Sequence, residues 1–370
     1  MGRRIWRNFD VVLLVSALLL IGLGIAMIYS ATLERSGSPT RLWDDFVFRQ
    51  AVYTIVGLVV MFIVAGIDYR FYRDSSHLIY AIGLVLLLLV FIFGRTTFGA
   101  QSWFYLRFVP VQPSELIKIV LVLILARYFS DHREDIQHPI HLILSLFYAA
   151  IPMGLVYLQP DLGTSLILGL IWLGMAWAAG IAIWQFGLLG LGGILAAPTI
   201  WFSLKPYMRD RIIAFFNPNR DPSGESYNVI QALISIGSGG MWGKGFARGT
   251  QSQLHFLRIR QTDFIFSVYA EELGFVGGII LLVLFLLLLL RTLRAASLAG
   301  DPFGQLIACG VAAMIFSQSF VNLAVNLNLL PATGLPLPFI SYGGSSLITM
   351  LIGLGLVQSI VMRHRKLEFE

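Results

Sequence analysis

The sequence contains little charge and almost no cysteine. Only 12% of its 370 residues are charged, whereas 57% are hydrophobic, and the mean hydropathy is +0.79. Because a soluble domain carries about 25% charged residues, this composition excludes a soluble globular protein. The single cysteine, Cys309, lies in an apolar stretch, which excludes an intramolecular disulfide and a cysteine-based metal site. The composition therefore predicts an integral membrane protein.

Apolar runs recur along the chain, and a bilayer-spanning helix needs about 20 such residues. We predict an all-α polytopic membrane protein, a single domain over residues 1–370, with one large loop at 205–263. The ten predicted spans are 11–31, 50–67, 77–94, 113–129, 141–158, 164–179, 184–204, 264–290, 304–326 and 341–362. Basic residues precede the first span without a convincing small-residue cleavage site, so this span is expected to remain uncleaved. Glycine-rich segments at 187–193 and 352–356 predict close helix packing.

The basic residues of the short loops indicate the orientation of the spans. Arg7 precedes the first span and Arg363 follows the last, and an even number of spans places both ends of the chain on one side. Arg70 and Arg127 fall on this same side, which the positive-inside rule makes cytoplasmic. We therefore expect both termini in the cytoplasm and the loop at 205–263 on the outer face.

The net charge of +6 is small and scattered, so no nucleic-acid partner is expected. Basic loops at a membrane surface favour anionic lipid or phosphate partners instead. Within the long loop, Val229, Ile230, Leu233 and Ile236 recur at helical spacing. This pattern predicts an amphipathic helix that either lies in the membrane interface or packs on the bundle of spans.

Polar residues gather at the outer ends of several predicted spans. Glu115 and Lys118 lie three residues apart on one helical face, either as a buried ion pair that neutralises itself or as part of a polar cavity. Asp161 follows Pro160 and either caps the next helix or serves as a metal ligand or loop anchor. Ser341 fits either a hydrogen-bond donor in a cavity or a structural re-entrant turn.

Asp263 lies at the predicted border of water and membrane. Thr262 and Asp263 directly precede the eighth span, so helix capping alone would explain this pair. Glu271 falls roughly on the Asp263 face, with Glu272 beside it, and carboxylates at this depth are costly unless they are paired or functional. No phosphate-binding glycine loop, zinc site or Ser-His-Asp triad is recognisable. The residues alone predict an outward-facing polar site for an anionic, lipid-linked ligand, and leave a transporter and a transferase both open.

Six segments with polar residues stand out along the chain. They are FGAQSW, QPSELIK, QPDLGTS, FFNPNRDPSGESYNVIQALISIGSGGMWGKG, TDFIFSVYAEELGF and LLPATGLPLPFISYGGSS. Together, and in this order, they resemble the SEDS family (shape, elongation, division and sporulation) of bacterial membrane proteins over nearly the whole chain. Residues 242–245, residues 249–257 and the TGLPLP form of the last loop are more similar to the RodA branch of this family than to the FtsW branch.

The resemblance implies a peptidoglycan glycosyltransferase that polymerises lipid II on the outer face of the bacterial cytoplasmic (inner) membrane, for cell elongation and cell shape. It also implies undecaprenyl diphosphate as the leaving group. The implied partners are a class B penicillin-binding transpeptidase and other membrane proteins of the elongation machinery. The family's essential outer-loop aspartate matches Asp263. A lipid II flippase and a non-catalytic scaffold are the alternatives.

Transfer with inversion from an α-linked diphosphate needs a base for the acceptor hydroxyl and positive charge on the leaving group, but no enzyme nucleophile. We predict Asp263 as this base or as a ligand of a divalent cation, Mg²⁺ or Mn²⁺, and no organic cofactor. The residues expected to bind substrate are Lys244, Arg248, Arg258, Arg260, Glu115, Lys118 and Ser341. The residues expected to support the cavity are Asp161, Glu271, Glu272 and Arg49.

Three positions depart from the family pattern. Family members often carry proline where Arg258 stands, histidine where Gln261 stands and arginine where Ser102 stands. Because Gln261 cannot titrate, we assign it no catalytic role. Ser102 puts a phosphate-binding role of its position in doubt, and Arg107 and Arg49 are the candidate replacements.

Overall fold

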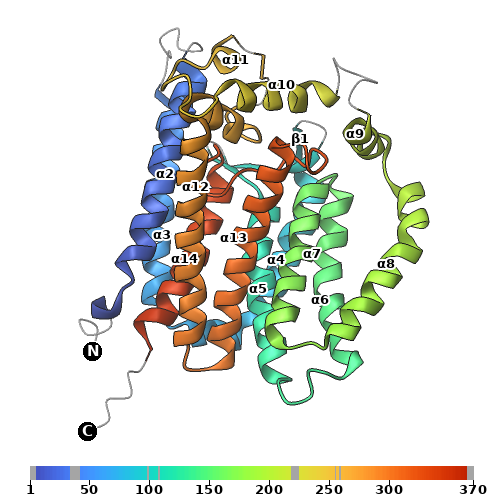
Figure 1. Cartoon of the computed structure of the whole chain (residues 1–370). Coiled ribbons are helices and arrows are strands. Elements are labelled where there is room, and N and C mark those ends of the chain that lie inside the picture. The colour runs from blue at the N-terminus through green and yellow to red at the C-terminus, as the bar shows by residue number, and fades with distance from the viewer. Residues whose placement is uncertain are drawn as a thin grey trace.

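The computed structural model describes residues 6–33, 42–97, 100–106, 109–217, 225–254, 256–257 and 260–364. They form a bundle of long helices (Figure 1). Eight of the helices in these residues are long and apolar enough to cross a membrane. These are α2 (Val11–Thr32), α3 (Phe46–Gly66), α4 (Tyr69–Phe93), α6 (Pro139–Leu158), α7 (Leu162–Ala179), α12 (Ile265–Leu298), α13 (Pro302–Asn326) and α14 (Gly344–Met362). The chain is a multi-pass membrane protein, as its composition predicts.

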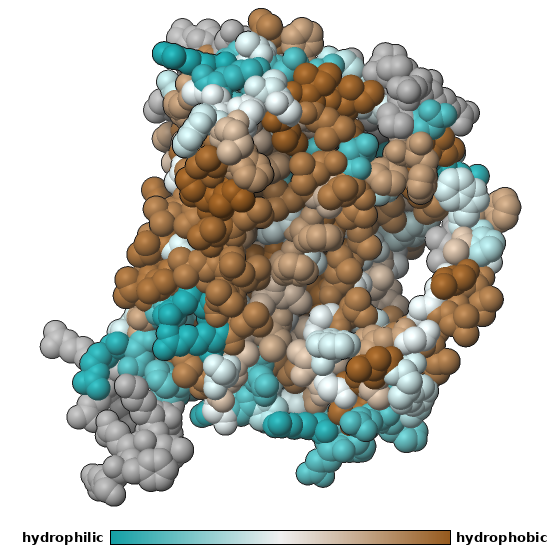
Figure 2. All heavy atoms as spheres, in the orientation of Figure 1, coloured by the Kyte–Doolittle hydropathy of each residue, from teal (hydrophilic) through white to brown (hydrophobic). Residues whose placement is uncertain are grey.

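Two further helices occupy the remaining predicted spans. Helix α5 (Pro113–Asp131) carries charged residues, but it packs against α4, α7, α13 and α14 and is mostly buried. Its charges therefore meet protein rather than lipid. Helix α8 (Ile183–Ser203) has a shorter apolar part, Ile183–Thr199, and nearly all of its side chains are exposed. It stands away from the other helices (Figure 1), and an opening separates it from the bundle (Figure 2).

The glycine-rich segments behave in two different ways. On α14, a Cβ at Gly355 would lie 2.7 Å from the Met61 carbonyl oxygen, so this glycine allows α3 and α14 to pack closely, as predicted. The glycines at 187–193 have no neighbouring atom within 4 Å, so the same prediction is wrong for α8. Glycine content alone cannot distinguish a helix that packs closely from one that stands apart.

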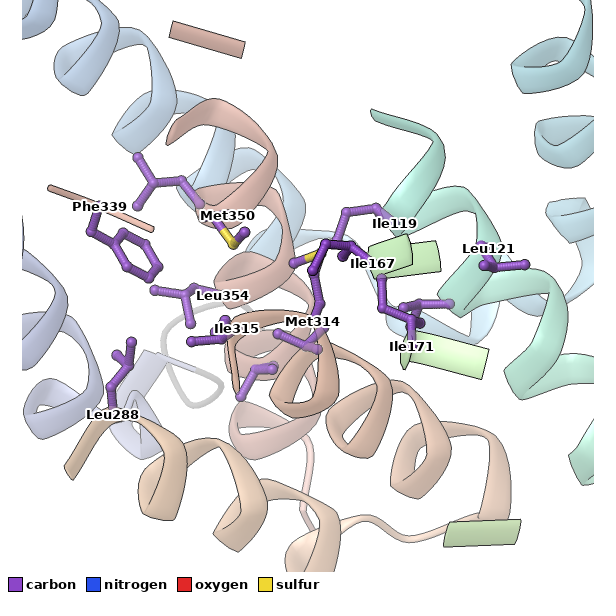
Figure 3. Packing of buried hydrophobic residues seen from close by; sticks show 14 of the residues in the cluster. Ile119, Leu121, Ile167, Ile171, Leu288, Met314, Ile315, Phe339, Met350 and Leu354 are labelled. Carbon is purple, nitrogen blue, oxygen red and sulfur yellow. The ribbon is translucent and has the colours of Figure 1, made fainter. Parts of the chain in front are cut away.

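Helix α13 lies at the centre of the apolar core. Figure 3 shows Met314 and Ile315 of α13 between side chains of the surrounding helices. The labelled side chains from other helices include Ile119 of α5, Ile167 and Ile171 of α7, Leu288 of α12, and Met350 and Leu354 of α14, and all of these are buried. On the face that Figure 2 shows, apolar side chains form a broad band across the bundle, and hydrophilic residues gather at its two ends.

The two ends of the bundle differ in structure. At one end, which we call the terminal end, α2 begins and α14 ends (Figure 1), as an even number of spans predicts. Ion pairs lie there, including Arg291 with Asp10 at 2.7 Å and Arg73 with Asp131 at 2.6 Å. The opposite end, which we call the loop end, carries the segments between α8 and α12 and between α13 and α14 (Figure 1).

The loop end contains short elements that cover the bundle. Three antiparallel strands, β1 (Arg95–Thr97), β2 (Ala100–Leu106) and β3 (Val109–Val111), form in a segment for which the sequence predicts no span. The predicted loop at 205–263 contains α9 (Pro206–Phe216), α10 (Glu225–Ser238) and α11 (Thr250–Gln253). Helix α10 is the predicted amphipathic helix. It lies across the loop end (Figure 1) and packs against α12, the second of the two predicted alternatives.

Candidate functional site

Asp263 does not cap a helix, so the capping interpretation is wrong. Helix α12 begins at Ile265, and its N-cap position is Phe264, which makes no side-chain capping bond. The Asp263 carboxylate lines a cavity of about 60 Å³ at the loop end instead. The polar lining residues that share this cavity are Arg211, Asn228, Asn322 and Thr333. The carboxylate is therefore available to a ligand.

Two asparagines of α13 fix the backbone of Asp263. The side-chain amides of Asn322 and Asn326 donate to the Asp263 carbonyl oxygen at 2.9 and 3.0 Å. One residue earlier, the Ser341 hydroxyl donates to the Thr262 carbonyl oxygen at 2.6 Å. These bonds attach the segment before α12 to α13 and to the last outer loop. Sequence reasoning missed both asparagines, although amides four residues apart in an apolar helix are a detectable signal.

The surroundings of Asp263 make its carboxylate a stronger base. Desolvation raises its pKa from 3.8 to about 6, and the nearby Asp161 carboxylate also raises it. A hydrogen bond from the Thr262 side chain and the positive charge of Arg211 act in the opposite direction. With a pKa of about 6, the group is mostly ionised at neutral pH and accepts a proton more readily than an ordinary aspartate.

Arg211 is the cation that the structure brings to Asp263. It lies on α9, lines the Asp263 cavity, and donates from Nη1 to the Ala332 carbonyl oxygen at 3.5 Å. The sequence places Arg211 only within a basic loop, because nothing local to α9 indicates a contact with a segment beyond α10 and α11. The predicted diphosphate partners Lys244, Arg248 and Arg260 are absent from the lining of this cavity as far as the described residues define it.

Asp161 caps α7, as predicted, and also belongs to a polar cluster. Its Oδ1 accepts from the Thr164 backbone N–H at 3.0 Å, and its Oδ2 accepts from the Gln112 side-chain amide at 3.2 Å. Desolvation raises the pKa of Asp161, and the negative charge of Glu115 adds to this effect. Asp161 therefore links the Asp263 cavity electrostatically to the charged pair of α5.

The predicted pair of Glu115 and Lys118 is a buried ion pair. Lys118 Nζ lies 2.8 Å from Glu115 Oε1, and the two side chains are 0% and 3% exposed. Lys118 also donates to Gln318 Oε1 at 2.8 Å, and the Gln318 amide donates to the Pro336 carbonyl oxygen at 3.0 Å. The pair thus ties α5 to α13 and to the last outer loop.

The Glu271–Glu272 region is a break in α12. Gly274 has φ 67° and ψ −165°, which interrupts the helical hydrogen bonds. The freed carbonyl oxygens of Glu271 and Glu272 accept from the backbone N–H groups of Lys244 and Gly245, both at 3.0 Å. In return, the N–H groups of the two residues after Gly274 donate to the carbonyls of residues 240 and 241, at 2.9 and 3.1 Å. The loop therefore replaces the bonds that α12 loses.

The two glutamate side chains hold the same loop. Glu271 Oε1 accepts from Lys244 Nζ at 2.8 Å and from the Gln251 backbone N–H at 2.9 Å. Glu272 accepts from the Ala247 backbone N–H at 3.0 Å and from the Ser30 hydroxyl. Both glutamates are fully buried. Their contacts give these carboxylates a structural role between α12 and the outer loop.

We predict that Lys244→Met lowers the free energy of unfolding by about 1–3 kcal/mol, because it leaves the buried Glu271 carboxylate without its cation. Thermal unfolding in detergent measures this effect. Exposed Arg248 is the matched control, and Arg248→Met should stay within about 0.5 kcal/mol of the native protein. Adding Glu271→Gln to Lys244→Met should restore part of the loss. An unchanged unfolding temperature with a raised substrate KM would favour the predicted diphosphate contact of Lys244 instead.

The other predicted site residues that the structure describes are Arg49, Ser341, Arg248 and Arg260. Arg49 donates to the Asp44 carbonyl oxygen and stacks on the rings of Phe46 and Tyr342, at 4.9 and 5.8 Å from their centroids. The predicted structural turn at Ser341 is present, since this hydroxyl also accepts from the Leu337 backbone N–H. Arg260 is buried and Arg248 is exposed. The residues that lie outside the described part of the chain are Arg258 and Arg107.

Few groups in the described chain suit a metal ion. No cluster of three or more His, Cys, Asp or Glu side chains is arranged to hold one among these residues. Asp263 is the carboxylate that lines the cavity, and the Asp161 carboxylate interacts with it electrostatically. A cation at this site would therefore need phosphate oxygens of a ligand to complete its coordination.

The fold is that of a polytopic membrane protein. Its candidate site is a cavity at the loop end, which is lined by Arg211 and by Asp263, a carboxylate with a raised pKa. The chain belongs to the FtsW/RodA/SpoVE family, whose model, described as a cell cycle protein, matches residues 10–366. It is 40% identical to peptidoglycan glycosyltransferase MrdB of Escherichia coli over 97% of this chain and 96% of that protein. It is 35% identical to stage V sporulation protein E of Bacillus subtilis over 95% and 96% of the two chains.

Two solved structures resemble the whole chain. A chain of a peptidoglycan synthase complex that coordinates polymerization and crosslinking has a TM-score of 0.78 at 35% identity, and the match covers 96% of this chain and 98% of that one. Rod shape determining protein RodA of Thermus thermophilus has a TM-score of 0.72 at 31% identity, over 98% and 99% of the two chains. The predicted family and the predicted membrane fold are thus confirmed.

Proposed function

We propose that this protein is a peptidoglycan glycosyltransferase that polymerises lipid II into glycan strands for cell elongation and cell shape. The observation that carries this proposal is the Asp263 carboxylate, which has a pKa of about 6 and faces a cavity beside Arg211. The Escherichia coli relative at 40% identity is named a peptidoglycan glycosyltransferase, which supports the same activity.

In this mechanism, Asp263 accepts the proton of the acceptor hydroxyl while that oxygen attacks the anomeric carbon of the donor sugar. The bond between this carbon and the diphosphate oxygen breaks, and its electron pair leaves with undecaprenyl diphosphate. One displacement inverts the α linkage to β-1,4, so no enzyme nucleophile is needed. Arg211 lies on the cavity wall, where its charge stabilises the negative charge that develops on the diphosphate.

A divalent cation, Mg²⁺ or Mn²⁺, would supply further positive charge at the diphosphate. Asp263 is the residue of this chain placed to share it, together with the diphosphate oxygens. The carboxylate would then act as base or as ligand.

We place the loop end on the outer face of the bacterial inner membrane, with both termini in the cytoplasm. The arginines of the terminal end support this orientation. We further propose a class B penicillin-binding transpeptidase as partner, together with other membrane proteins of the elongation machinery. A structural relative belongs to a complex that coordinates polymerization with crosslinking, which supports a partner of this type.

The distribution of polar groups favours a transferase over a lipid II flippase. Asp263, Arg211 and Asp161 gather at the loop end, whereas the charged groups described above at the terminal end form ion pairs. A flippase needs a polar path to both faces of the membrane. The buried pair of Glu115 and Lys118 is already neutralised and does not extend such a path.

Purified protein mixed with labelled lipid II, alone and with the transpeptidase, tests the proposal. We expect glycan polymer, and gel separation of the labelled product measures its length. Transport of labelled lipid II across proteoliposomes without polymer would identify a transporter. Polymer that needs an added polymerase would identify a scaffold.

The same assay yields a prediction on pH. Activity should rise as the pH increases through about 6, because Asp263 acts as a base only when it is ionised. Arg211 lowers the Asp263 pKa, so Arg211→Gln should move the midpoint of the rise to a higher pH. Profiles of kcat/KM against pH measure both effects. The control is Arg209→Gln on the same helix, since Arg209 instead donates to the Phe202 carbonyl oxygen. A midpoint that stays in place in Arg211→Gln would contradict the electrostatic interaction between Arg211 and Asp263.

A further inference from the structure

A second cavity lies next to the Asp263 cavity, between α9, α10 and the last outer loop. Its volume is about 310 Å³. The apolar residues that line it are Ala214, Phe215, Val229, Ile230, Leu233, Ile234, Pro331 and Ala332. Leu233 and Ile234 are 39% and 45% exposed, so apolar surface continues outward at its rim. We call this space the α9–α10 cavity.

The α9–α10 cavity and the Asp263 cavity share part of their walls. Arg211 and Ala332 line both of them, and the Arg211 guanidinium donates to the Ala332 carbonyl oxygen. A ligand that fills both spaces therefore passes Arg211. Such a ligand would place an apolar portion in the α9–α10 cavity and another portion next to Asp263. A negative charge on it would lie beside Arg211, where the two cavities meet.

The beginning of α10 adds polar groups to this junction. Ser226 is 3% exposed and lines the α9–α10 cavity, and its hydroxyl has no hydrogen-bond partner in the part of the chain that the structure describes. Ser226 lies in the first turn of α10 (Glu225–Ser238), where backbone N–H groups favour an anion. The buried hydroxyl and the helix terminus both suit a phosphate oxygen.

We infer that the α9–α10 cavity binds the first isoprene units of a polyprenyl diphosphate, and that Arg211 and the beginning of α10 bind its diphosphate. This inference rests on the proposed function, which supplies a substrate of this chemistry. The chain enters an apolar cavity, the diphosphate lies at the junction of the two cavities, and the sugar extends toward Asp263. The cavity thereby sets the position of the anomeric carbon relative to the base.

The size and charge of the α9–α10 cavity favour this occupant over others. Its volume is at the lower end of the range of about 300–1,000 Å³ for small-molecule sites. A partner helix is about 10 Å wide and needs a long groove rather than a pocket. An ordinary phospholipid also has apolar chains and a phosphate, but it has two acyl chains and one phosphate diester in place of a single chain and a diphosphate that carries a sugar.

The test uses the full-length protein in detergent and two probes, undecaprenyl diphosphate and inorganic diphosphate. Ala214→Phe fills the cavity, and Ile230→Asn places a polar amide in it. The matched control is Ala150→Phe, at an exposed alanine of α6. We expect Ala214→Phe and Ile230→Asn to weaken binding of undecaprenyl diphosphate by about tenfold or more. Inorganic diphosphate should bind these variants as it binds the native protein, and Ala150→Phe should change neither affinity.

Several results would overturn the inference. One is that Ala214→Phe and Ile230→Asn both bind undecaprenyl diphosphate as tightly as the native protein and unfold at the same temperature. Another is an equal loss of affinity for both probes, since the variants would then have damaged the diphosphate site. Displacement of undecaprenyl diphosphate by equal amounts of phosphatidylglycerol would also exclude the assigned occupant. Absence of polymer from a native protein that binds undecaprenyl diphosphate through this cavity would contradict the proposed function alone.

Discussion

Asp263→Asn is expected to reduce glycan polymerisation by about 10²- to 10⁴-fold, the range that a general base contributes. Asparagine has nearly the same shape but cannot accept the acceptor proton. Its backbone carbonyl can keep the bonds from Asn322 and Asn326, which do not involve the side chain. The fold and the membrane yield should therefore remain intact. Polymerisation with labelled lipid II and thermal unfolding of the same preparation measure the two properties.

The stability of Asp263→Asn provides its own control. The carboxyl pKa is about 6 in the folded protein, against 3.8 ordinarily, so the folded state binds the proton more tightly. The ionised carboxylate destabilises the fold fully above pH about 6, and this effect disappears as the pH falls below about 4. Asp263→Asn should therefore be more stable than the native protein at neutral pH by up to about 3 kcal/mol, with no difference at low pH. Full activity of Asp263→Asn would contradict the base mechanism.

Lys118→Met is expected to destabilise the protein by about 3–5 kcal/mol, because it leaves the Glu115 carboxylate buried without its cation. The loss should be visible as a large decrease in unfolding temperature and in the yield of folded protein. The double variant Glu115→Gln/Lys118→Met removes both charges. It should recover much of the stability, since a neutral pair has no uncompensated charge.

The exposed ion pair of Arg73 and Asp131 is the matched control for Lys118→Met. Its atoms lie 2.6 Å apart, and Arg73→Met should cost less than about 1 kcal/mol. Equal losses in Lys118→Met and Arg73→Met would show that burial does not govern these pairs. Failure of the double variant to recover would show that Lys118 has a further role, for which its contact with Gln318 is the candidate.

The sequence predicts the features of this protein that depend on neighbouring residues. Apolar runs define the membrane spans, and a three-residue spacing places Glu115 and Lys118 on one helical face. Asp161 caps α7 because a cap depends only on the residues that follow it. The same local reasoning fails at Asp263. There, bonds from α13 and from Ser341 hold the backbone, and α12 begins later.

Contacts between distant segments could not be predicted in this way. Arg211 reaches the Asp263 cavity only because α9 and α10 fold back across the loop end, and the sequence carries no local signal of that path. The roles of Glu271 and Glu272 depend on the break at Gly274, and the sequence predicts a continuous helix there. The family resemblance identifies Asp263 as the catalytic candidate, whereas its neighbours follow only from the structure.

The break in α12 has a mechanical consequence. A Cβ at Gly243 would lie 2.1 Å from the Glu272 carbonyl oxygen, and one at Gly274 would lie 2.3 Å from the Gly243 nitrogen, so the two backbones cross in direct contact. The backbone bonds on both sides of this crossing make the outer loop and the first turns of α12 one stiff unit. A displacement of that loop is therefore transmitted to the first turns of α12 and to Asp263, while the break at Gly274 separates this unit from the membrane-spanning part of α12.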